Sequence, residues 1–227
     1  EWAAHFAKRF LPPNGIMVSA QNCMNHHLIA SIVGYNREVA CVVSGISVAL
    51  WEPGHVQRRR DPTGPEHKVF RVGELHGKIT PRVEELAELL GCVDGTYPTT
   101  NVWGERWAKL AVNAAANPVI AMTGLGSQGV ANDPRARLVH IHLAKETAQV
   151  GLGLNYDVEP VSGVAADVWA RADEGDVFEE LDARMQPRAD REDWKNSMIQ
   201  DVLKGRKTEI EQMNGYIVER GREVGVP

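Results

Sequence analysis

The 227-residue sequence contains no long apolar run, no excess of basic charge and only three cysteines. No stretch approaches the roughly 18 consecutive apolar residues that a membrane helix needs, so we expect no membrane partner. The formal net charge of -5 offers no broad attraction to a polyanion, so we expect no nucleic-acid partner. Cys23, Cys41 and Cys92 lie far apart without CxxC spacing, which favours neither a metal site nor a redox site and fits a reducing cytoplasm.

A glycine-rich dinucleotide fingerprint is present in its letters but lacks the required context. Residues 124–129 read GLGSQG, and Glu146 follows at about the expected distance of 20 residues. The fingerprint needs a strand before it, whereas residues 119–122 extend a helical pattern. We therefore predict that these glycines end a helix and turn the chain, and that they bind no dinucleotide.

The first hundred residues mix strand and helix patterns. Aromatic residues at every fourth position predict a helix at the start of the chain. Residues 16–20 form a short apolar run that leads into Gln21 and Asn22, which predicts a buried strand whose end carries polar groups, where ligands of α/β sheets sit. Further expected elements are a strand pair within 39–50 and 55–59, a strand at 69–75 and a helix at 81–90.

The second half of the sequence has the pattern of long helices. Helices are expected at 103–122, 135–151, 164–172 and 193–224, the last with breaks at Gly205 and Gly221. We predict a domain boundary near Thr100, with an α/β part at 1–100 and an all-helical domain at 101–227. The charged segment 173–191 is expected to cover the surface.

Three polar residues share one face of the helix expected at 103–122. Lys109, Asn113 and Asn117 are spaced at i, i+4 and i+8 against alanine and valine. Such fixed hydrogen-bonding groups on an apolar background are costly unless something pairs with them, and a small oxygen-rich substrate would do so. The spacing alone leaves open the alternative that the asparagines bond neighbouring loops and the lysine is solvated.

A second polar run gives the sequence a specific resemblance. Residues 196–215 read NSMIQDVLKGRKTEIEQMNG, which resembles the C-terminal signature of ketopantoate reductases. The lysine helix matches that family's lysine and two asparagines in the same order, and Gln21 and Asn22 resemble its Gln-Asn-Gly strand end. The resemblance continues through residues 45–56 and 72–74 and covers nearly the whole chain.

This resemblance implies a fold, an activity and partners. The expected fold is α/β plus all-α: the C-terminal part of a Rossmann-type domain, then a helical substrate-binding and dimerisation domain of the 6-phosphogluconate dehydrogenase C-terminal type. The implied reaction is NADPH-dependent reduction of a 2-oxo acid between these two domains, with ketopantoate and pantothenate biosynthesis as the first expectation. A homodimer and no metal are also expected.

The resemblance also implies a role for each site residue. Lys109 would donate a proton to the ketone oxygen and stabilise the developing alkoxide. Asn113, Asn117 and Ser197 would bind the substrate's oxygens, and Glu209 would meet its distal hydroxyl or the nicotinamide end of the cofactor. The remaining implied positions are Asn22, beside the nicotinamide ribose, and Ser127, in the substrate site.

The sequence departs from the family pattern at three places. Cys23 replaces the usual glycine where the backbone approaches the cofactor, and Ser127 stands about where ketopantoate-binding members carry asparagine. No glycine-rich phosphate turn precedes Glu1, so we expect a fragment that binds NADPH poorly by itself. Two alternatives stay open: a dehydrogenase of bulkier 2-oxo acids resembling D-mandelate dehydrogenases, and a non-catalytic helical dimerisation or binding module.

Overall fold

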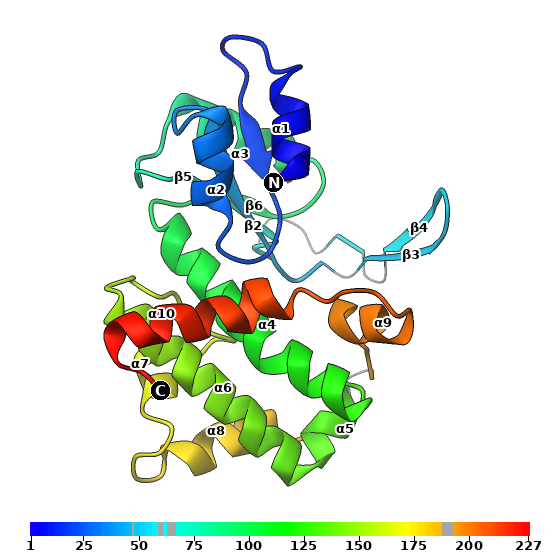
Figure 1. Ribbon diagram of the computed structural model, residues 1–227, viewed down its shortest axis with the longest axis vertical. Helices are drawn as coiled ribbons and strands as arrows, with labels where there is room; N and C mark the ends of the chain where they lie inside the picture. The colour runs from blue at the N-terminus through cyan, green and yellow to red at the C-terminus, as the bar shows by residue number, and fades with distance from the viewer. Residues whose placement is uncertain (47, 59–60, 63–66, 188–192) are drawn as a thin grey trace. The chain divides into compact units, whose positions relative to one another are not determined.

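The computed structural model describes residues 1–46, 48–58, 61–62, 67–187 and 193–227 (Figure 1). The chain divides into two compact units, Glu1–Arg106 and Trp107–Pro227. The division falls within α4 (Val102–Thr123), so the first turn of this helix belongs to the first unit.

A four-stranded mixed sheet forms the centre of the first unit. Its order is β1-β2-β5-β6, in which β1 runs parallel to β2, β2 antiparallel to β5, and β5 parallel to β6. A separate hairpin pairs β3 with β4. The strands are β1 (Met17–Ser19), β2 (Glu38–Val43), β3 (Val48–Glu52), β4 (His55–Arg58), β5 (Phe70–Glu74) and β6 (Thr96–Pro98).

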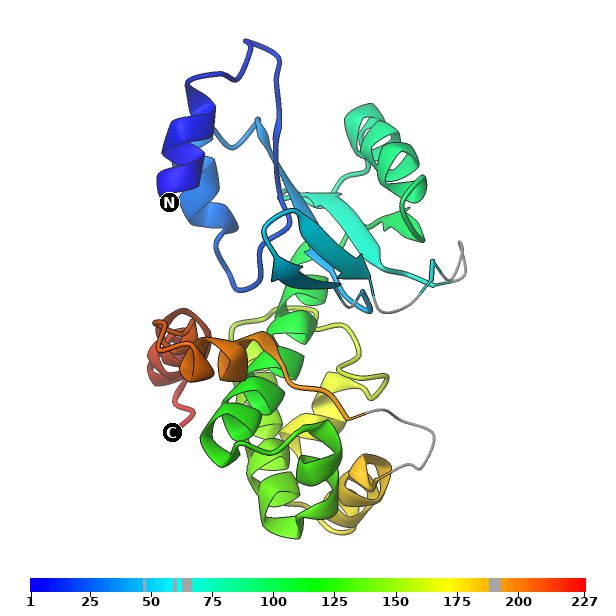
Figure 2. The ribbon, with the colours of Figure 1, turned by 90° about the vertical axis from the view of Figure 1, so that its right-hand side faces the viewer.

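Helices cover both faces of this sheet (Figure 2). Side chains alternate along β2, so Val39 and Cys41 pack with α3 (Pro81–Gly91), while Ala40 and Val42 pack with the first turn of α4. The helix α2 (His26–Val33) contacts β1 and β2, and α1 (Trp2–Lys8) packs against α2. This arrangement confirms the α/β character expected of the first part.

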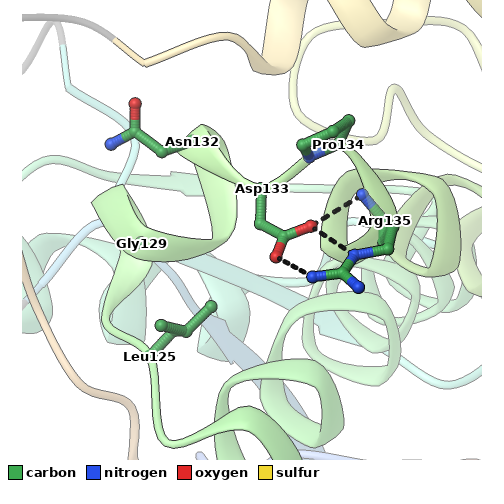
Figure 3. A pocket seen from close by; sticks show the side chains of 6 residues that line it. All are labelled: Leu125, Gly129, Asn132, Asp133, Pro134 and Arg135. Atoms are coloured by element: carbon green, nitrogen blue, oxygen red, sulfur yellow. Dashed lines mark hydrogen bonds and ion pairs between the residues drawn. The ribbon is translucent and has the colours of Figure 1, made fainter.

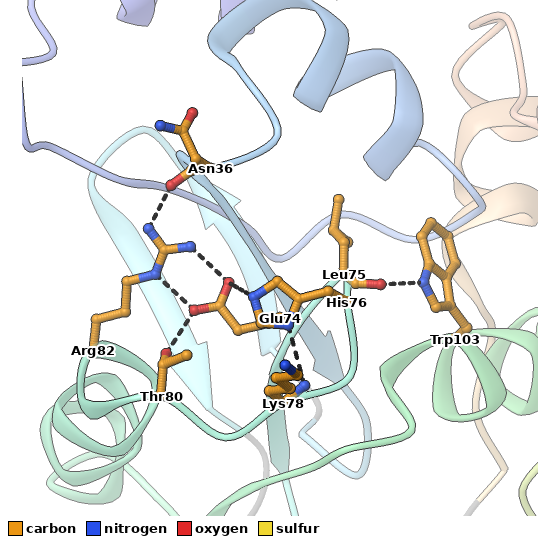
Figure 4. A network of polar contacts seen from close by, with 8 residues as sticks. All are labelled: Asn36, Glu74, Leu75, His76, Lys78, Thr80, Arg82 and Trp103. Atoms are coloured by element: carbon orange, nitrogen blue, oxygen red, sulfur yellow. Dashed lines mark hydrogen bonds and ion pairs between the residues drawn. The ribbon is translucent and has the colours of Figure 1, made fainter.

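An ion-pair network fixes the end of β5 to the start of α3 (Figure 4). Arg82 donates from Nε and Nη2 to the two carboxylate oxygens of Glu74 over 2.7 and 2.6 Å, and Thr80 Oγ1 donates to Oε1 over 2.6 Å. Arg82 also donates to the carbonyl of Asn36 over 2.5 Å. Burial would raise the pKa of Glu74, but the hydrogen bonds from Arg82 and Thr80 hold it below its ordinary value.

The second unit is built from helices around a seam of small residues. Ala108, Ala111 and Ala115 of α4 are buried in one cluster with Ile141 and Ala144 of α6. Besides α4 and one isolated β-bridge, its described elements are α5 (Ser127–Asn132), α6 (Pro134–Gly153), α7 (Ala166–Ala170), α8 (Val177–Met185), α9 (Ser197–Leu203), the π-helix η1 (Glu211–Gly215) and α10 (Tyr216–Val224).

The structure confirms some details of the sequence analysis and corrects others. Gly124 ends α4, with φ of 73° and its N–H bonded to Ile120 O over 3.0 Å, so the glycines of residues 124–129 do terminate a helix. The run 39–50 is not one strand, since β2 ends at Val43 and β3 begins at Val48. The predicted break at Gly221 is wrong, because α10 continues through it.

Two further findings concern the described residues as a set. None of their helices combines the length and apolar character needed to cross a bilayer. Nor do their His, Cys, Asp and Glu side chains gather in groups of three or more that could hold a metal ion.

Candidate active site

Lys109, Asn113 and Asn117 lie in line on α4, away from its alanine seam. Lys109 and Asn113 are half-buried, whereas Asn117 is buried with 7% of its surface exposed. The amide Nδ2 of Asn117 lies 4.0 Å from Sδ of Met213 in η1. The helix therefore offers one amine and two amides in a row, graded from half-buried to buried.

Two other asparagines tie the C-terminal segment to this helix. Asn196 Nδ2 donates to the carbonyl of Asn117 over 3.3 Å, and Asn214 Nδ2 donates to the carbonyl of Ala114 over 3.0 Å. The first bond reaches the backbone of Asn117 itself, and the second reaches the backbone of Ala114, the residue after Asn113. The segment that holds Ser197 and Glu209 is thus fixed to the helix that holds Lys109.

Ser197 lies at the first position of α9. Asn196 caps this helix, because its Oδ1 accepts the N–H of Ile199 over 3.1 Å while its Nδ2 reaches α4. Ser197 is exposed, whereas Asn196 is buried. The cap therefore holds the serine next to the residue that is bonded to Asn117.

Glu209 stands two residues before the π-helix η1. Its side chain is exposed, and its carbonyl accepts the N–H of Met213 over 3.0 Å. A single π-helical turn is rare and often marks a functional position. The structure thus places Glu209 at the entrance of the turn whose Met213 and Asn214 contact α4.

Ser127 contacts a different segment. Its N–H donates to the carbonyl of Trp194 over 2.9 Å, and its Oγ accepts the N–H of Trp194 over 3.1 Å. Asp193 Oδ1 accepts the neighbouring N–H of Gln128 over 2.8 Å. Ser127 thereby joins the start of α5 to the residues that precede α9, and its predicted contact with substrate stays a prediction.

In the first unit, Asn22 follows the end of β1 and is exposed. The next residue, Cys23, has φ of 69°, in the left-handed region that glycine adopts without strain. The Cys23 side chain is buried, with 9% of its surface exposed. The backbone at position 23 therefore has the left-handed conformation that favours glycine, the residue usual in the family it resembles. This chain has a strained cysteine there, and its side chain is buried.

This strain gives a stability prediction. Cys23→Gly is expected to be more stable than Cys23→Ala by about 0.5 to 1 kcal/mol. Both variants remove the thiol, so the comparison isolates a Cβ in the left-handed region, partly offset by the greater freedom of glycine in the unfolded chain. Urea unfolding measures the difference, and an alanine variant as stable as the glycine variant would contradict it.

A buried polar cluster supports the strand end that carries Asn22. His26 Nδ1 lies 2.7 Å from Glu38 Oε1, and Arg106 donates to His26 Nε2, to the carbonyl of Cys41 over 3.1 Å and to the carbonyl of Gln21. Side chains of His26, Glu38 and Arg106 are at most 1% exposed. Because Arg106 donates to Nε2, His26 is neutral and its Nδ1–H donates to Glu38.

Burial shifts the pKa values of this cluster in opposite directions. It lowers the pKa of His26 from 6.5 to about 3, with a further contribution from the Arg106 charge. It raises the pKa of Glu38 from 4.5 to about 8, against the opposing effect of Arg106. Glu38 Oε2 has no hydrogen-bond partner within the described part of the chain, so no donor at that oxygen favours the ionised form.

The raised pKa of Glu38 predicts a pH dependence. A carboxyl group whose pKa is raised in the folded protein adds to the free energy of unfolding. For Glu38 this contribution is complete when the pH is below the ordinary pKa of 4.5, and it is lost as the pH rises through about 8. Glu38→Gln should therefore lose less unfolding free energy than the wild type between about pH 6 and about pH 9, by about 1 to 2 kcal/mol. Urea titrations at the two pH values measure this, and parallel losses in both proteins would refute it.

A surface hollow of about 510 Å³ lies at the junction of α5 and α6 (Figure 3). Asp133 caps α6 there, accepting the N–H of Arg135 over 2.8 Å and its guanidinium over 3.3 Å, which lowers the carboxyl pKa. The described residues that line the hollow include none of the predicted site residues. They are Leu125, Gly129, Asn132, Asp133, Pro134 and Arg135. The charges of this hollow serve the helix cap, so the polar face of α4 is the better candidate site.

A family model and a curated relative both match ketopantoate reductases, which are also called 2-dehydropantoate 2-reductases. The model of the ketopantoate reductase PanE/ApbA C terminal matches residues 101–227. A 2-dehydropantoate 2-reductase of Archaeoglobus fulgidus is 28% identical over 213 residues, which cover 93% of this chain and 63% of that protein. This chain therefore spans less than two thirds of that relative.

Two solved structures share the fold. One is a PanE/ApbA family ketopantoate reductase from Ralstonia eutropha JMP134, which matches with a TM-score of 0.74 at 23% identity. The match covers all of this chain and 66% of the reductase. The other is the structure of D-mandelate dehydrogenase with NADH and anilino(oxo)acetate, which matches with a TM-score of 0.76 at 17% identity. This match covers 99% of this chain and 66% of the dehydrogenase chain. At these identities the likeness establishes the fold class predicted from the sequence.

Proposed function

The chain belongs to the PanE/ApbA ketopantoate reductase family, and from this premise we propose that the full-length protein reduces a 2-oxo acid to a 2-hydroxy acid. The observation that carries the proposal is the polar face of α4, which presents an amine and two amides on the helix to which Asn196 and Asn214 fix the C-terminal segment. Proton donation and carboxylate binding need such fixed groups.

Lys109 is the proposed general acid. A bound nicotinamide cofactor would supply the hydride. The ammonium of Lys109 would give its proton to the ketone oxygen, and its charge would stabilise the negative charge that develops there. Its half-buried position on a regular helix keeps that charge in a defined place.

The neutral donors have a complementary role. Asn113, Asn117 and Ser197 would bind the carboxylate and other oxygens of the substrate, orienting it without neutralising the lysine. Glu209, exposed beside η1, would accept a hydrogen bond from a distal hydroxyl of the substrate or from the nicotinamide end of the cofactor. Ser127 is proposed as a further contact that sets substrate size.

Two features of the first unit support a nicotinamide cofactor. Asn22 is exposed just beyond β1, which runs parallel to β2, and such strand ends are where α/β sheets bind nucleotides. Cys23 buries its side chain, so the thiol does not project where a cofactor would approach. Asn22 would hold the nicotinamide ribose, and NADPH is the proposed cofactor on the family resemblance.

Ketopantoate is the first proposed substrate, and a bulkier 2-oxo acid is the second. The serine at position 127 favours the second, and the fold shared with D-mandelate dehydrogenase is compatible with it. The family resemblance also supports a cytoplasmic homodimer. A non-catalytic binding module is the competing proposal from another class, and it predicts no turnover.

Oxidation of reduced nicotinamide by the full-length protein tests the proposal. The assay compares NADPH with NADH and ketopantoate with aliphatic and aromatic 2-oxo acids. Turnover that depends on a 2-oxo acid supports the reductase, and the best substrate identifies the branch. A folded protein that oxidises neither cofactor with any acid of the panel refutes the reductase in favour of the binding module.

A further inference from the structure

Pro118 leaves a gap in the hydrogen bonding of α4. It lies inside this 22-residue helix and has no N–H, so the carbonyl of Ala114 lacks its usual partner four residues on. Ala114 and Pro118 are both buried, so water does not readily fill the gap. An unpaired buried carbonyl costs free energy, and this one lies between Asn113 and Asn117.

The amide of Asn214 fills that gap. Its Nδ2 lies 3.0 Å from the carbonyl oxygen of Ala114, which is 100 positions away in the sequence. A flipped amide would set two oxygens against each other, so this orientation is fixed. Asn214 Oδ1 is buried without a hydrogen-bond partner among the described residues, so the donor half of the amide is what this position uses.

We propose that Asn214 is a positioning residue of the reductase, an inference that rests on the proposed function. Its amide replaces the N–H that Pro118 lacks and so holds α4 regular between Asn113 and Asn117, the two amides assigned to the substrate. Asn214 acts on the substrate through α4, in the same way that Asn196 acts through the carbonyl of Asn117.

The test is a rescue by a second substitution. Asn214→Ala should raise KM for the 2-oxo acid about tenfold and leave KM for the cofactor unchanged, since the gap disturbs the substrate amides. Pro118→Ala supplies an N–H at the gap and should be close to wild type alone. The double variant Asn214→Ala/Pro118→Ala should regain most of the lost affinity for the acid.

A matched control uses the same kind of bond elsewhere. The exposed Asn132 Nδ2 donates to the carbonyl of Gln128 over 2.9 Å within α5, and Asn132→Ala should leave both KM values unchanged. Hydrogen exchange of the α4 amides gives a readout independent of turnover. It should quicken around residues 114–121 in Asn214→Ala and slow again in the double variant.

The outcomes separate this inference from the proposed function. Wild-type protein without turnover refutes the reductase, and exchange then decides whether Asn214 completes the helix. Wild-type turnover with an unchanged KM for the acid in Asn214→Ala overturns the inference alone. A double variant as impaired as Asn214→Ala also overturns it, because the missing N–H would then not be what the amide replaces.

Discussion

Lys109→Ala is expected to lower kcat for 2-oxo acid reduction about a thousandfold or more. A positioned general acid contributes roughly 10²- to 10⁴-fold, and a charge that stabilises a developing oxyanion contributes a comparable factor. Both effects are assigned to one side chain, so one substitution removes both. Steady-state oxidation of reduced nicotinamide at saturating acid measures the loss, with circular dichroism to confirm the fold.

Lys204→Ala is the matched control. Lys204 is an exposed lysine at the end of α9 in the same unit, so its loss removes a charge without touching α4. It should leave kcat within about twofold of wild type, as expected for a surface substitution. A folded Lys109→Ala protein that retains turnover at the level of this control would exclude the lysine as the acid.

The spacing of Lys109, Asn113 and Asn117 could be predicted because it depends on helix periodicity alone, and α4 has the expected course. Asn196 and Asn214 could not be assigned, since their bonds to α4 join positions 79 and 100 residues apart. Pro118 gave the one available signal. A proline within a strongly helical pattern implies a carbonyl that needs a donor from elsewhere.

The error at Gly221 has a packing explanation. Glycine inside a helical pattern usually indicates a break, but a Cβ at this position would lie 3.0 Å from Val226 O and 3.4 Å from Val150 Cγ2 of α6. The glycine therefore allows α10 to approach α6 and the chain end closely. Local sequence does not distinguish a glycine that ends a helix from one that lets two segments meet.

The buried cluster of the first unit was invisible to the sequence for a similar reason. Glu38, His26 and Arg106 belong to residue types that are mostly exposed or only partly buried, and they come from a strand and two helices. Among the residues that Arg106 contacts in this cluster, the closest in sequence is Cys41, which lies 65 positions before it. Only tertiary packing shows that an arginine on α4 holds the strand end of Gln21 and Asn22.

Arg106→Met should lower the unfolding free energy by about 2 to 5 kcal/mol, because it leaves buried acceptors without a donor, at a cost of about 1 to 3 kcal/mol each. Methionine fills much of the volume but donates no hydrogen bond. The buried carbonyl of Cys41 loses its 3.1 Å partner, and His26 Nε2 loses its donor. Urea unfolding of the variant and the wild type measures the difference.

The control for Arg106→Met is Arg135→Met, which removes an ion pair whose arginine is 89% exposed and should cost less than about 1 kcal/mol. Adding Glu38→Gln to Arg106→Met should restore part of the loss at neutral pH, because without the arginine nothing opposes the raised pKa of Glu38, whereas glutamine has no charge to lose on burial. The single variant should also lose stability more steeply above neutral pH than the wild type, since Arg106 is what opposes the rise of the Glu38 pKa. If Arg106→Met and Arg135→Met were equally stable, the cluster would not hold the first unit together.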